Sequence, residues 1–501
     1  MTRVTSLDLD VAPSSVVVGD EAQFALAGRG PGHRLVVVAP ADAAWLDAFE
    51  GEVARRGDEA VLTGPLSERN AAALRGRLEW LRPVLLGLRT SAGFGDRLGL
   101  ATPGHIRALR AVEAGRTGAS SIAPIFAQQS IREMSRTART PQQVVDEAMW
   151  GVFSEGWHGG FGADADHLKQ PEHVDDCLAA GFTFFTVDPG DHVEASAERL
   201  GDVELRDAFE RLPWQQLEDE PAAFGGRYAG RAFDADGHRV SMDTRAAVVA
   251  AVKYGRAVAH VVLMFRHLLE RAGAGQFELE VSLDETERPT SHAEHVYVAS
   301  ELKRLGVSWV SLAPRFVGRF EKGVDYIGDQ RQFQADVGVH AAIARAFGPY
   351  KLSLHSGSDK FGIYGAVAAA TRGLVHVKTA GTSYLEALRT VALADPGLFR
   401  EIYAYARERY ETDRATYHVS ATLDRAPEAG AGQPDALVKL LDDFHARQVL
   451  HVTFGSVLTV KDNTGAPRFA ERLMAVLRAN EDAYAQNLER HFRRHLEPFA
   501  V

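Results

Sequence analysis

Residues 350–384 read YKLSLHSGSDKFGIYGAVAAATRGLVHVKTAGTSY, and this stretch contains the pattern that decides the fold. Two short strand-like runs, KLSL and LVHV, each end in a cluster of polar residues and glycines. A helix-like segment, FGIYGAVAAAT, lies between them. A strand, a helix and a second strand in this order are typical of a parallel sheet.

The same pattern recurs on both sides of this stretch, from about Arg82 onward. Eight runs follow it: RPVLLGLRTSAGFGD, SSIAPIFAQQS, GGFGADADHLK, GFTFFTVDPGDH, QFELEVSLDET, VSWVSLAPRF, YKLSLHSGSDKF and GLVHVKTAGTSY. Eight strands alternating with helices predict an α/β fold, a closed (β/α)8 barrel with a small N-terminal subdomain and insertions. An open, doubly wound parallel sheet is the alternative.

The 501 residues exceed the roughly 250 that such a barrel needs, so we expect additional segments. We predict an N-terminal subdomain over 1–80, the barrel over 81–390 and a mostly helical extension over 391–501. An acidic, glycine-containing stretch at about 193–243 is interpreted as an insertion. In the extension, QVLHVTFGSVLT is interpreted as a short strand or a loop.

The overall charge argues against two classes of partner. A net charge of −11 and a pI near 6.0 disfavour general binding to nucleic acids or anionic membranes. The single cysteine, Cys177, allows no intrachain disulfide, and neither a signal-peptide pattern nor a run of 18 apolar residues is present. We therefore expect a cytoplasmic protein that acts on a small molecule, and a homo-oligomer is compatible with this interpretation.

Alternation along the strand FELEVSLDET separates an outer face from an inner one. Glu280, Ser282 and Asp284 share the face opposite to the apolar side chains, so they should point into the barrel. Functional residues in such barrels gather at the C-terminal ends of the strands. Glu280 and Asp284 are therefore candidate catalytic residues.

Two further strands direct histidines and a lysine to the same place. By the same alternation, His355 in KLSLHSG points inward, as do His376 and Lys378 in LVHVKT. We expect His355 and His376 to lie at matching depth on neighbouring strands. Imidazoles and carboxylates that converge in a pocket suit a divalent cation such as Zn²⁺ or Mn²⁺. The alternative is that each histidine is a hydrogen-bonded core residue.

The run GGFGADADHLK places Asp164, Asp166 and His167 at the end of another strand. A carboxylate beside a metal-bound histidine can transfer protons next to a substrate oxygen. Helix capping is an alternative role for one of the two aspartates. At the next strand end, Asp188 in TVDPGDH is a candidate substrate-binding residue.

An anionic substrate would need cationic or polar anchors at this end of the barrel. The candidates are Gln128, Arg97, Arg315, Arg319, Lys360 and Lys378, although surface ion pairing is an alternative for each charged one. SAGFGD lacks the glycine spacing of a dinucleotide fingerprint, and no GxxxxGK[ST] element occurs. An NAD or nucleoside-triphosphate cofactor is therefore not expected.

Several long segments resemble those of the tagaturonate epimerase family and occur in the same order. They are GGFGADADHLK, FTFFTVDPGDHV, LEVSLDETERPTSHAEH, SLAPRFVGRFEKGVDYIGD, LHSGSDKFGIY, HVKTAGTSYLEALR and QVLHVTFGSVL. The resemblance spans about Arg82 to the C-terminus. It implies an enzyme that interconverts tagaturonate and fructuronate with a divalent metal, while some relatives act on tagatose and fructose.

The DHL element is also similar to motifs of class II aldolases and aldolase subunits, in which the histidine binds metal and the aspartate transfers protons. That likeness implies Asp166 as the proton-transfer residue and His167 as a metal ligand, with His355 and His376 completing the ligand set. Zn, Mn, Ni and Co all suit such ligands.

The inverted carbon in these substrates lies β to the ketone, so enolisation alone cannot invert it. Retro-aldol cleavage, rotation of the aldehyde and re-addition would do so, with Asp166 and Glu280 or Asp284 handling protons. Three alternatives use a similar pocket: a metal-dependent aldolase that releases the fragments, a non-catalytic sugar-acid-binding or aldolase-assisting protein, and an isomerase that moves the carbonyl.

Overall fold

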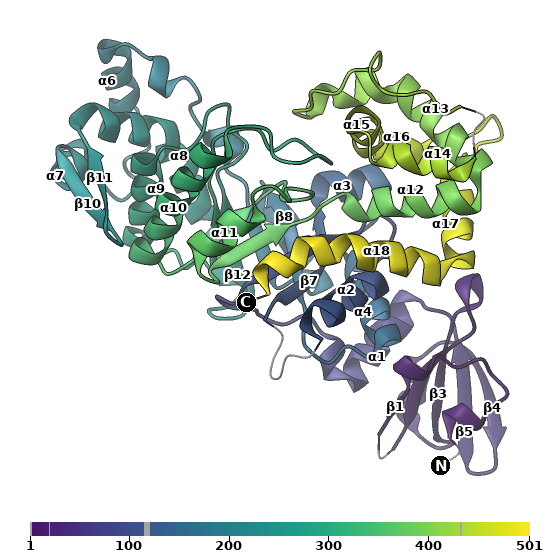
Figure 1. The fold of residues 1–501 in the computed structure, drawn as a ribbon. Coiled ribbons are helices and arrows are strands. Elements are labelled where there is room, and N and C mark those ends of the chain that lie inside the picture. The colour runs from purple at the N-terminus through teal and green to yellow at the C-terminus, as the bar shows by residue number, and fades with distance from the viewer. Residues whose placement is uncertain (1–2, 20, 115–120, 431–432, 501) are drawn as a thin grey trace.

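The chain forms a barrel with an N-terminal sheet on one side, and the C-terminal helices lie above that sheet in the view of Figure 1. The computed structural model describes residues 3–19, 21–114, 121–430 and 433–500.

The expected (β/α)8 barrel is confirmed. Eight parallel strands close into one sheet in the order β12-β13-β14-β15-β6-β7-β8-β9. Pairing of β15 with β6, and of β9 with β12, leaves no free edge in this ring. The strands are β6 (Ser91–Gly95), β7 (Ala123–Ser130), β8 (Gly162–Leu168), β9 (Phe184–Val187), β12 (Glu278–Ser282), β13 (Ser311–Ala313), β14 (Lys351–Leu354) and β15 (Val375–Lys378).

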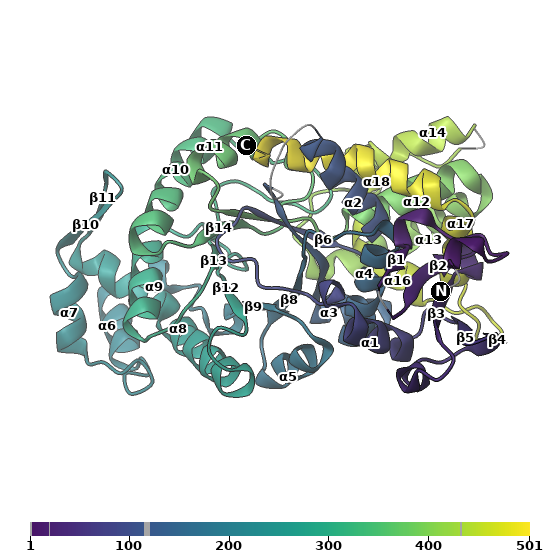
Figure 2. The same ribbon diagram turned by 90° about the horizontal axis from the view of Figure 1, so that it is seen from below.

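Helices surround this ring, as Figure 2 shows from below. They are α2 (Thr102–Glu113), α3 (Ile131–Thr137), α4 (Pro141–Glu155), α5 (Pro171–Ala180), α8 (Thr244–Ala272), α9 (His292–Arg304), α10 (Gln330–Phe347), α11 (Tyr364–Thr371) and α12 (Thr382–Ala394). Local sequence sets several of the starts. Ser291 and Glu294 form a capping box at α9, and the Asp243 carboxylate caps α8.

The first barrel strand, β6, does not include the most apolar residues of the predicted segment. In RPVLLGLRTSAGFGD the strand is SAGFG, whereas Val84 and Leu85 are both 42% exposed in the segment before it. Small residues suit this position because Gly93 packs against the Gln128 side chain and Gly95 against Ala380.

The N-terminal sheet is a separate antiparallel subdomain in the order β1-β2-β3-β5-β4. Its strands are β1 (Val17–Val18), β2 (Gln23–Ala27), β3 (Arg34–Pro40), β4 (Glu52–Arg56) and β5 (Glu59–Gly64), followed by α1 (Glu68–Arg77). Alternation along β3 serves two cores: Leu35 and Val37 join the main hydrophobic core, whereas Val36 and Val38 belong to a small one.

The region 193–243 contains α6 (Asp202–Glu210), α7 (Pro221–Tyr228) and a hairpin of β10 (Arg231–Ala235) and β11 (His238–Met242). By length and composition alone, the following helix α8 could cross a membrane. However, 72% of its most apolar window is buried inside the fold, as in a core helix.

The C-terminal extension is helical and returns to the barrel. It comprises α13 (Pro396–Asp413), α14 (Pro434–Val438), α15 (Phe444–Val452), α16 (Phe454–Thr459), α17 (Ala470–Ala479) and α18 (Glu481–Leu496). Helix α18 packs along α2 and α12 (Figure 1). The segment QVLHVTFGSVLT forms parts of α15 and α16, so its interpretation as a strand or loop was wrong.

Candidate active site

A cavity of about 300 Å³ opens at the C-terminal ends of the barrel strands. Polar and charged side chains from seven of the eight strand ends line it: Arg97, Gln128, Asp166, His167, Asp284, Arg315, His355 and Lys378. Most of the predicted site residues therefore lie around one space. This is the end of a (β/α)8 barrel at which catalytic residues are found.

Strand β8 delivers both members of the Asp166–His167 pair to the cavity through an irregularity. Successive residues of a regular strand face opposite sides, so only one of the two would point inward. The register of β8 against β9 shifts between Ala165 and Leu168, and His167 has a left-handed φ of 54°. Such a conformation is unusual for a histidine, and a bulge can redirect a side chain at a functional site.

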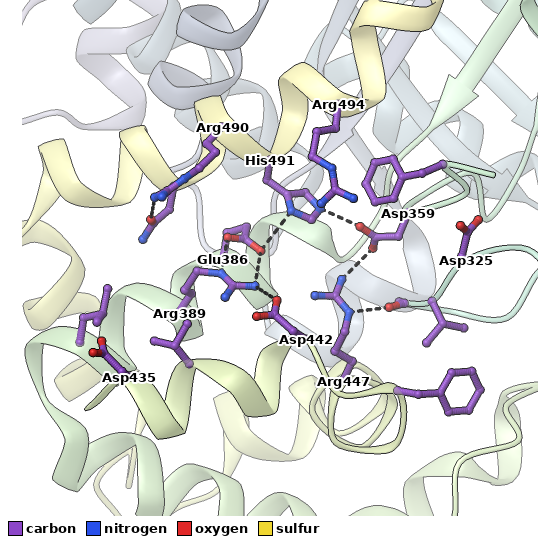
Figure 3. Close-up of a pocket in the computed structure, with 17 residues that line it drawn as sticks. Asp325, Asp359, Glu386, Arg389, Asp435, Asp442, Arg447, Arg490, His491 and Arg494 are labelled. Carbon is purple, nitrogen blue, oxygen red and sulfur yellow. Dashed lines mark hydrogen bonds and ion pairs between the residues drawn. The ribbon is translucent and has the colours of Figure 1, made fainter. Parts of the chain in front are cut away.

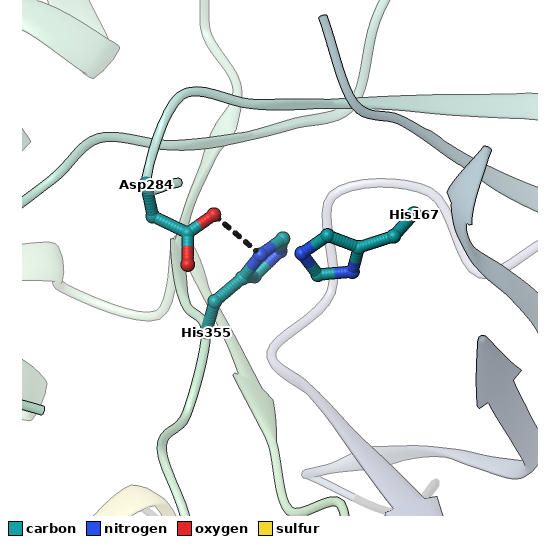
Figure 4. A group of neighbouring side chains, drawn as sticks. All are labelled: His167, Asp284 and His355. Carbon is teal, nitrogen blue, oxygen red and sulfur yellow. Dashed lines mark hydrogen bonds and ion pairs between the residues drawn. The ribbon is translucent and has the colours of Figure 1, made fainter. Parts of the chain in front are cut away.

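Three potential metal ligands converge at the cavity wall. His167, Asp284 and His355 each offer a ligand atom, and these atoms lie within 4.8 Å of one another (Figure 4). His355 Nδ1 is 3.0 Å from Asp284 Oδ1, and the two imidazole rings are 5.0 Å apart between centroids. Two imidazoles and a carboxylate are a suitable donor set for a borderline divalent cation.

Each of these histidines is also held by a second carboxylate. Asp166 Oδ1 lies 2.8 Å from His167 Nδ1, and Glu280 Oε1 lies 2.6 Å from His355 Nε2. Nε2 of His167, and Nδ1 of His355 beside Asp284, are thereby the ring atoms available to a cation. A carboxylate behind the imidazole is the arrangement that orients histidine ligands in metal sites.

His376 is not part of this group. The expected equal depth of His355 and His376 is wrong, because the register of β14 on β15 pairs His376 with Ser353, two residues below His355. His376 is fully buried, and its Nδ1 lies 2.9 Å from Ser91 Oγ. The structure thus places Asp284, rather than His376, beside the other two histidines.

Lys378 lies among three carboxylates, one of which, Asp166, lines the cavity together with it. Its Nζ is 2.8 Å from Asp164 Oδ2, 2.6 Å from Asp166 Oδ1 and 2.8 Å from Glu280 Oε1, and it donates to Thr186 Oγ1 at 2.7 Å. Although burial disfavours the ammonium, these carboxylates raise the pKa of Lys378 well above its usual value. Lys378 is therefore a permanent cation that keeps the acidic residues together.

The carboxylates and histidines shift each other's pKa values in opposite directions. Burial favours neutral Asp166, but the charges of His167 and Lys378 outweigh it and lower the Asp166 pKa well below its usual range. Burial would also neutralise His355, yet the Asp284 and Glu280 carboxylates raise its pKa to about 10. With no cation, both Asp166 and His355 are thus charged at neutral pH.

The other predicted anchors have different surroundings. Arg97 lines the cavity but is paired with Glu133 at 2.7 Å, and the Gln128 amide donates to Asp166 Oδ2 at 3.3 Å. Asp188 is buried outside the cavity lining and accepts from the Gly190 N–H. Lys360 lies outside the lining too, and its Nζ donates to three backbone carbonyls.

Two cations of the cavity have no acidic partner in the part of the chain that the structure describes. Arg315 makes no ion pair, and its Nε is buried without a hydrogen bond. Lys322 donates only to Ser356 Oγ, at 2.7 Å, and burial lowers its pKa. Sequence reasoning missed Lys322 because it lies in a loop, outside any strand whose alternation could place it.

The C-terminal helices brace the loop that carries His355. Four residues beyond it, Asp359 adopts a left-handed φ of 59° and binds Arg447 of α15 at 2.9 Å and His491 of α18 at 2.6 Å (Figure 3). A cavity of about 670 Å³ lies beside this network. It is less suited to catalysis, because Asp359 is paired as described and Arg389 there is paired with Glu386.

Comparisons with known proteins find relatives that match nearly the whole chain. A family model described as tagaturonate epimerase matches residues 13–499. A Thermotoga maritima protein named tagaturonate/fructuronate epimerase is 44% identical over 431 residues, which cover 86% of this chain and 85% of that protein. Crystal structures of fructuronate-tagaturonate epimerase from Cohnella laeviribosi, native and with one glycerol, are similar with TM-scores of 0.90 and 35% identity, over 99% of this chain and 98% of theirs.

Proposed function

This chain belongs to the tagaturonate epimerase family, and we propose that it interconverts D-tagaturonate and D-fructuronate by inverting the hydroxyl-bearing carbon β to the ketone. It is a carbohydrate epimerase, an isomerase. The observation that carries the proposal is the convergence of His167, Asp284 and His355 on a cavity that also holds two unpaired cations. A cytoplasmic location is part of the proposal, in keeping with the single, buried Cys177.

We propose that His167, Asp284 and His355 hold a divalent cation, with Zn²⁺, Mn²⁺, Ni²⁺ and Co²⁺ all compatible with the donors. Charge balance supports this assignment. In the protein without a cation, Asp166 and Asp284 raise the pKa of His167 against the effect of burial, as Asp284 and Glu280 do for His355. A divalent cation would therefore take the place of positive charge that these carboxylates otherwise stabilise on the histidines.

This exchange predicts a pH dependence of metal binding. Because His355 is protonated at neutral pH without metal, and nearby carboxylates also raise the pKa of His167, raising the pH removes competing protons, and cation binding should release at least one of them. The apparent affinity should rise at least about tenfold per pH unit between about pH 6 and pH 8. Calorimetry in buffers of different ionisation enthalpy measures the released protons. A pH-independent affinity would contradict the assignment.

When bound, the cation would act as a Lewis acid that polarises the substrate carbonyl. Asp166 supplies the base. Its Oδ1 is engaged by Lys378 and His167, whereas Oδ2 receives only the long bond from Gln128 and faces the cavity. The low pKa keeps Asp166 ionised, the charge state that a proton acceptor requires.

The reaction that fits these groups is retro-aldol cleavage and re-addition. Asp166 takes the proton of the hydroxyl on the carbon to be inverted, the adjacent C–C bond breaks, and its electron pair forms an enolate. The aldehyde fragment turns, the enolate re-adds to its other face, and Asp166 returns the proton. Lys378 and Glu280 hold Asp166 and His355 in place throughout.

We propose that Arg315 and Lys322 bind the carboxylate of the uronate. An unpaired, half-buried cation is stabilised by an anionic ligand, and both side chains reach the same cavity as the three ligands. The burial that lowers the Lys322 pKa would be compensated by the substrate's charge.

Replacing either cation should select against the acidic substrate. Arg315→Gln or Lys322→Gln is expected to lower kcat/KM for tagaturonate roughly 10- to 100-fold, since a charged hydrogen bond contributes about 1.5–3 kcal/mol. Activity toward tagatose, which lacks the carboxylate, should change little. Arg319→Gln is the matched control, because Arg319 pairs with Glu321 and does not line the cavity. Equal losses with both substrates would contradict this role.

The function is tested by incubating metal-reconstituted enzyme with tagaturonate and separately with tagatose, and identifying the products by NMR. We expect fructuronate from tagaturonate, and a lower rate with tagatose. Accumulation of three-carbon fragments would indicate an aldolase, and binding without turnover would indicate a sugar-acid-binding protein.

A further inference from the structure

A second group of potential ligands lies on two barrel helices, away from the mouth cavity. His292 begins α9, and Asp336 and His340 are one turn apart on α10. His292 Nε2 is 3.1 Å from Asp336 Oδ1, and His340 Nε2 is 3.7 Å from the same oxygen. The three ligand atoms lie within 4.8 Å of one another, and none of the three residues lines the mouth cavity.

One ligand atom of this group is buried and makes no hydrogen bond. His340 is fully buried, and its Nε2 has no hydrogen-bond partner. Its other nitrogen, Nδ1, lies 2.8 Å from His295 Nδ1, and His295 Nε2 lies 2.8 Å from the Tyr350 hydroxyl. Buried polar atoms are rarely left unsatisfied, so Nε2 points to a missing partner.

We propose that His292, Asp336 and His340 form a second cation site, one that takes a borderline divalent transition metal such as Zn²⁺. Two imidazole nitrogens and a carboxylate favour such an ion over Mg²⁺ or Ca²⁺, which prefer all-oxygen ligands. The His292 side chain is 35% exposed, so a cation can reach the site from solvent.

The hydrogen bonds that link His340, His295 and Tyr350 can rearrange when a cation binds to His340. With a proton on His340 Nδ1, this nitrogen donates to His295, which donates in turn to the Tyr350 oxygen, and His340 Nε2 keeps a free lone pair. The reverse arrangement puts a proton on Nε2. The cation selects the first arrangement.

Such a cation would clamp α9 to α10 next to the segment that carries Arg315. The backbone N–H of Val317 donates to Asp336 Oδ2 at 3.4 Å, and the ring of Phe316 packs edge-on against His340 at 5.6 Å. Removing the cation should therefore affect stability first.

Zinc stoichiometry in the full-length, metal-stripped protein tests this inference. After equilibration with Zn²⁺ and removal of free ion, elemental analysis should find two equivalents in wild type, one in His292→Gln, one in His167→Ala and none in the double variant. His292 is the residue to replace because it is partly exposed. His267→Gln is the matched control, since His267 pairs with Asp175 at 2.9 Å and has no third ligand within the described chain.

A second readout uses thermal unfolding. In the His167→Ala background, Zn²⁺ should raise Tm by at least about 2 °C, and the further change His292→Gln should remove this rise. The inference is overturned if His292→Gln binds as much zinc as wild type. The test also works if the site at the barrel mouth binds no zinc. Wild type would then bind one equivalent, at the second site, and His292→Gln would bind none.

Discussion

His355→Ala is expected to lower kcat/KM for tagaturonate at least about 10³-fold and to remove the metal from the barrel mouth. A Lewis-acid cation supplies several kcal/mol of transition-state stabilisation, and each 1.4 kcal/mol or so is a factor of ten in rate. Loss of His355 also leaves Glu280 and Asp284 without their shared partner. Steady-state kinetics and elemental analysis of the same preparation measure both effects.

His376→Ala is the matched control for this experiment. Both histidines face the barrel interior, but His376 lies two residues lower and contacts Ser91 rather than the ligand group. The variant should keep the mouth metal, and its Tm shows whether the core has survived the substitution. If His376→Ala lost the metal while His355→Ala kept it, the ligand assignment would be refuted.

The second large effect is expected for Asp166→Asn. General acid–base catalysis contributes about 10² to 10⁴ in rate, so kcat should fall by that factor. Metal content should remain near normal, because asparagine keeps an oxygen that can accept the His167 Nδ1–H bond. Turnover and bound metal are measured together.

Asp164→Asn is the matched control, because it removes a negative charge beside Lys378 without removing the proposed base. Asp164 also pairs with Lys378, but it lies outside the cavity lining, and burial raises its pKa to about 6. A loss of less than about tenfold is expected for this variant, because general acid–base catalysis requires contact with the substrate. Equal losses in both variants would assign the effect to the Lys378 environment and not to a base at Asp166.

Periodicity was sufficient to predict the barrel and the direction of several side chains. Glu280, Asp284, His355 and Lys378 face the barrel interior as the alternation of their strands predicts, because a regular strand has a strict period of two. The Asp166–His167 pair was predicted from its residue types and from the likeness to class II aldolases, and not from alternation. Its arrangement depends on a bulge that alternation does not encode.

Depth along the barrel axis could not be predicted from single strands. Whether His376 lies level with His355 depends on how β14 and β15 are staggered, and that stagger is a property of the closed ring. Lys322 and the bracing of Asp359 by the C-terminal helices depend on loops and on contacts between residues far apart in the sequence. Likewise, QVLHVTFGSVLT is rich in β-branched residues but forms helices, because packing overrides local propensity.

The most direct test of the central claim is an anomalous-diffraction measurement on crystals of the active, metal-loaded enzyme. The account predicts a peak at the barrel mouth within about 2.0–2.3 Å of His167, Asp284 and His355. A fully active crystal form in which these three side chains contact no cation would contradict it.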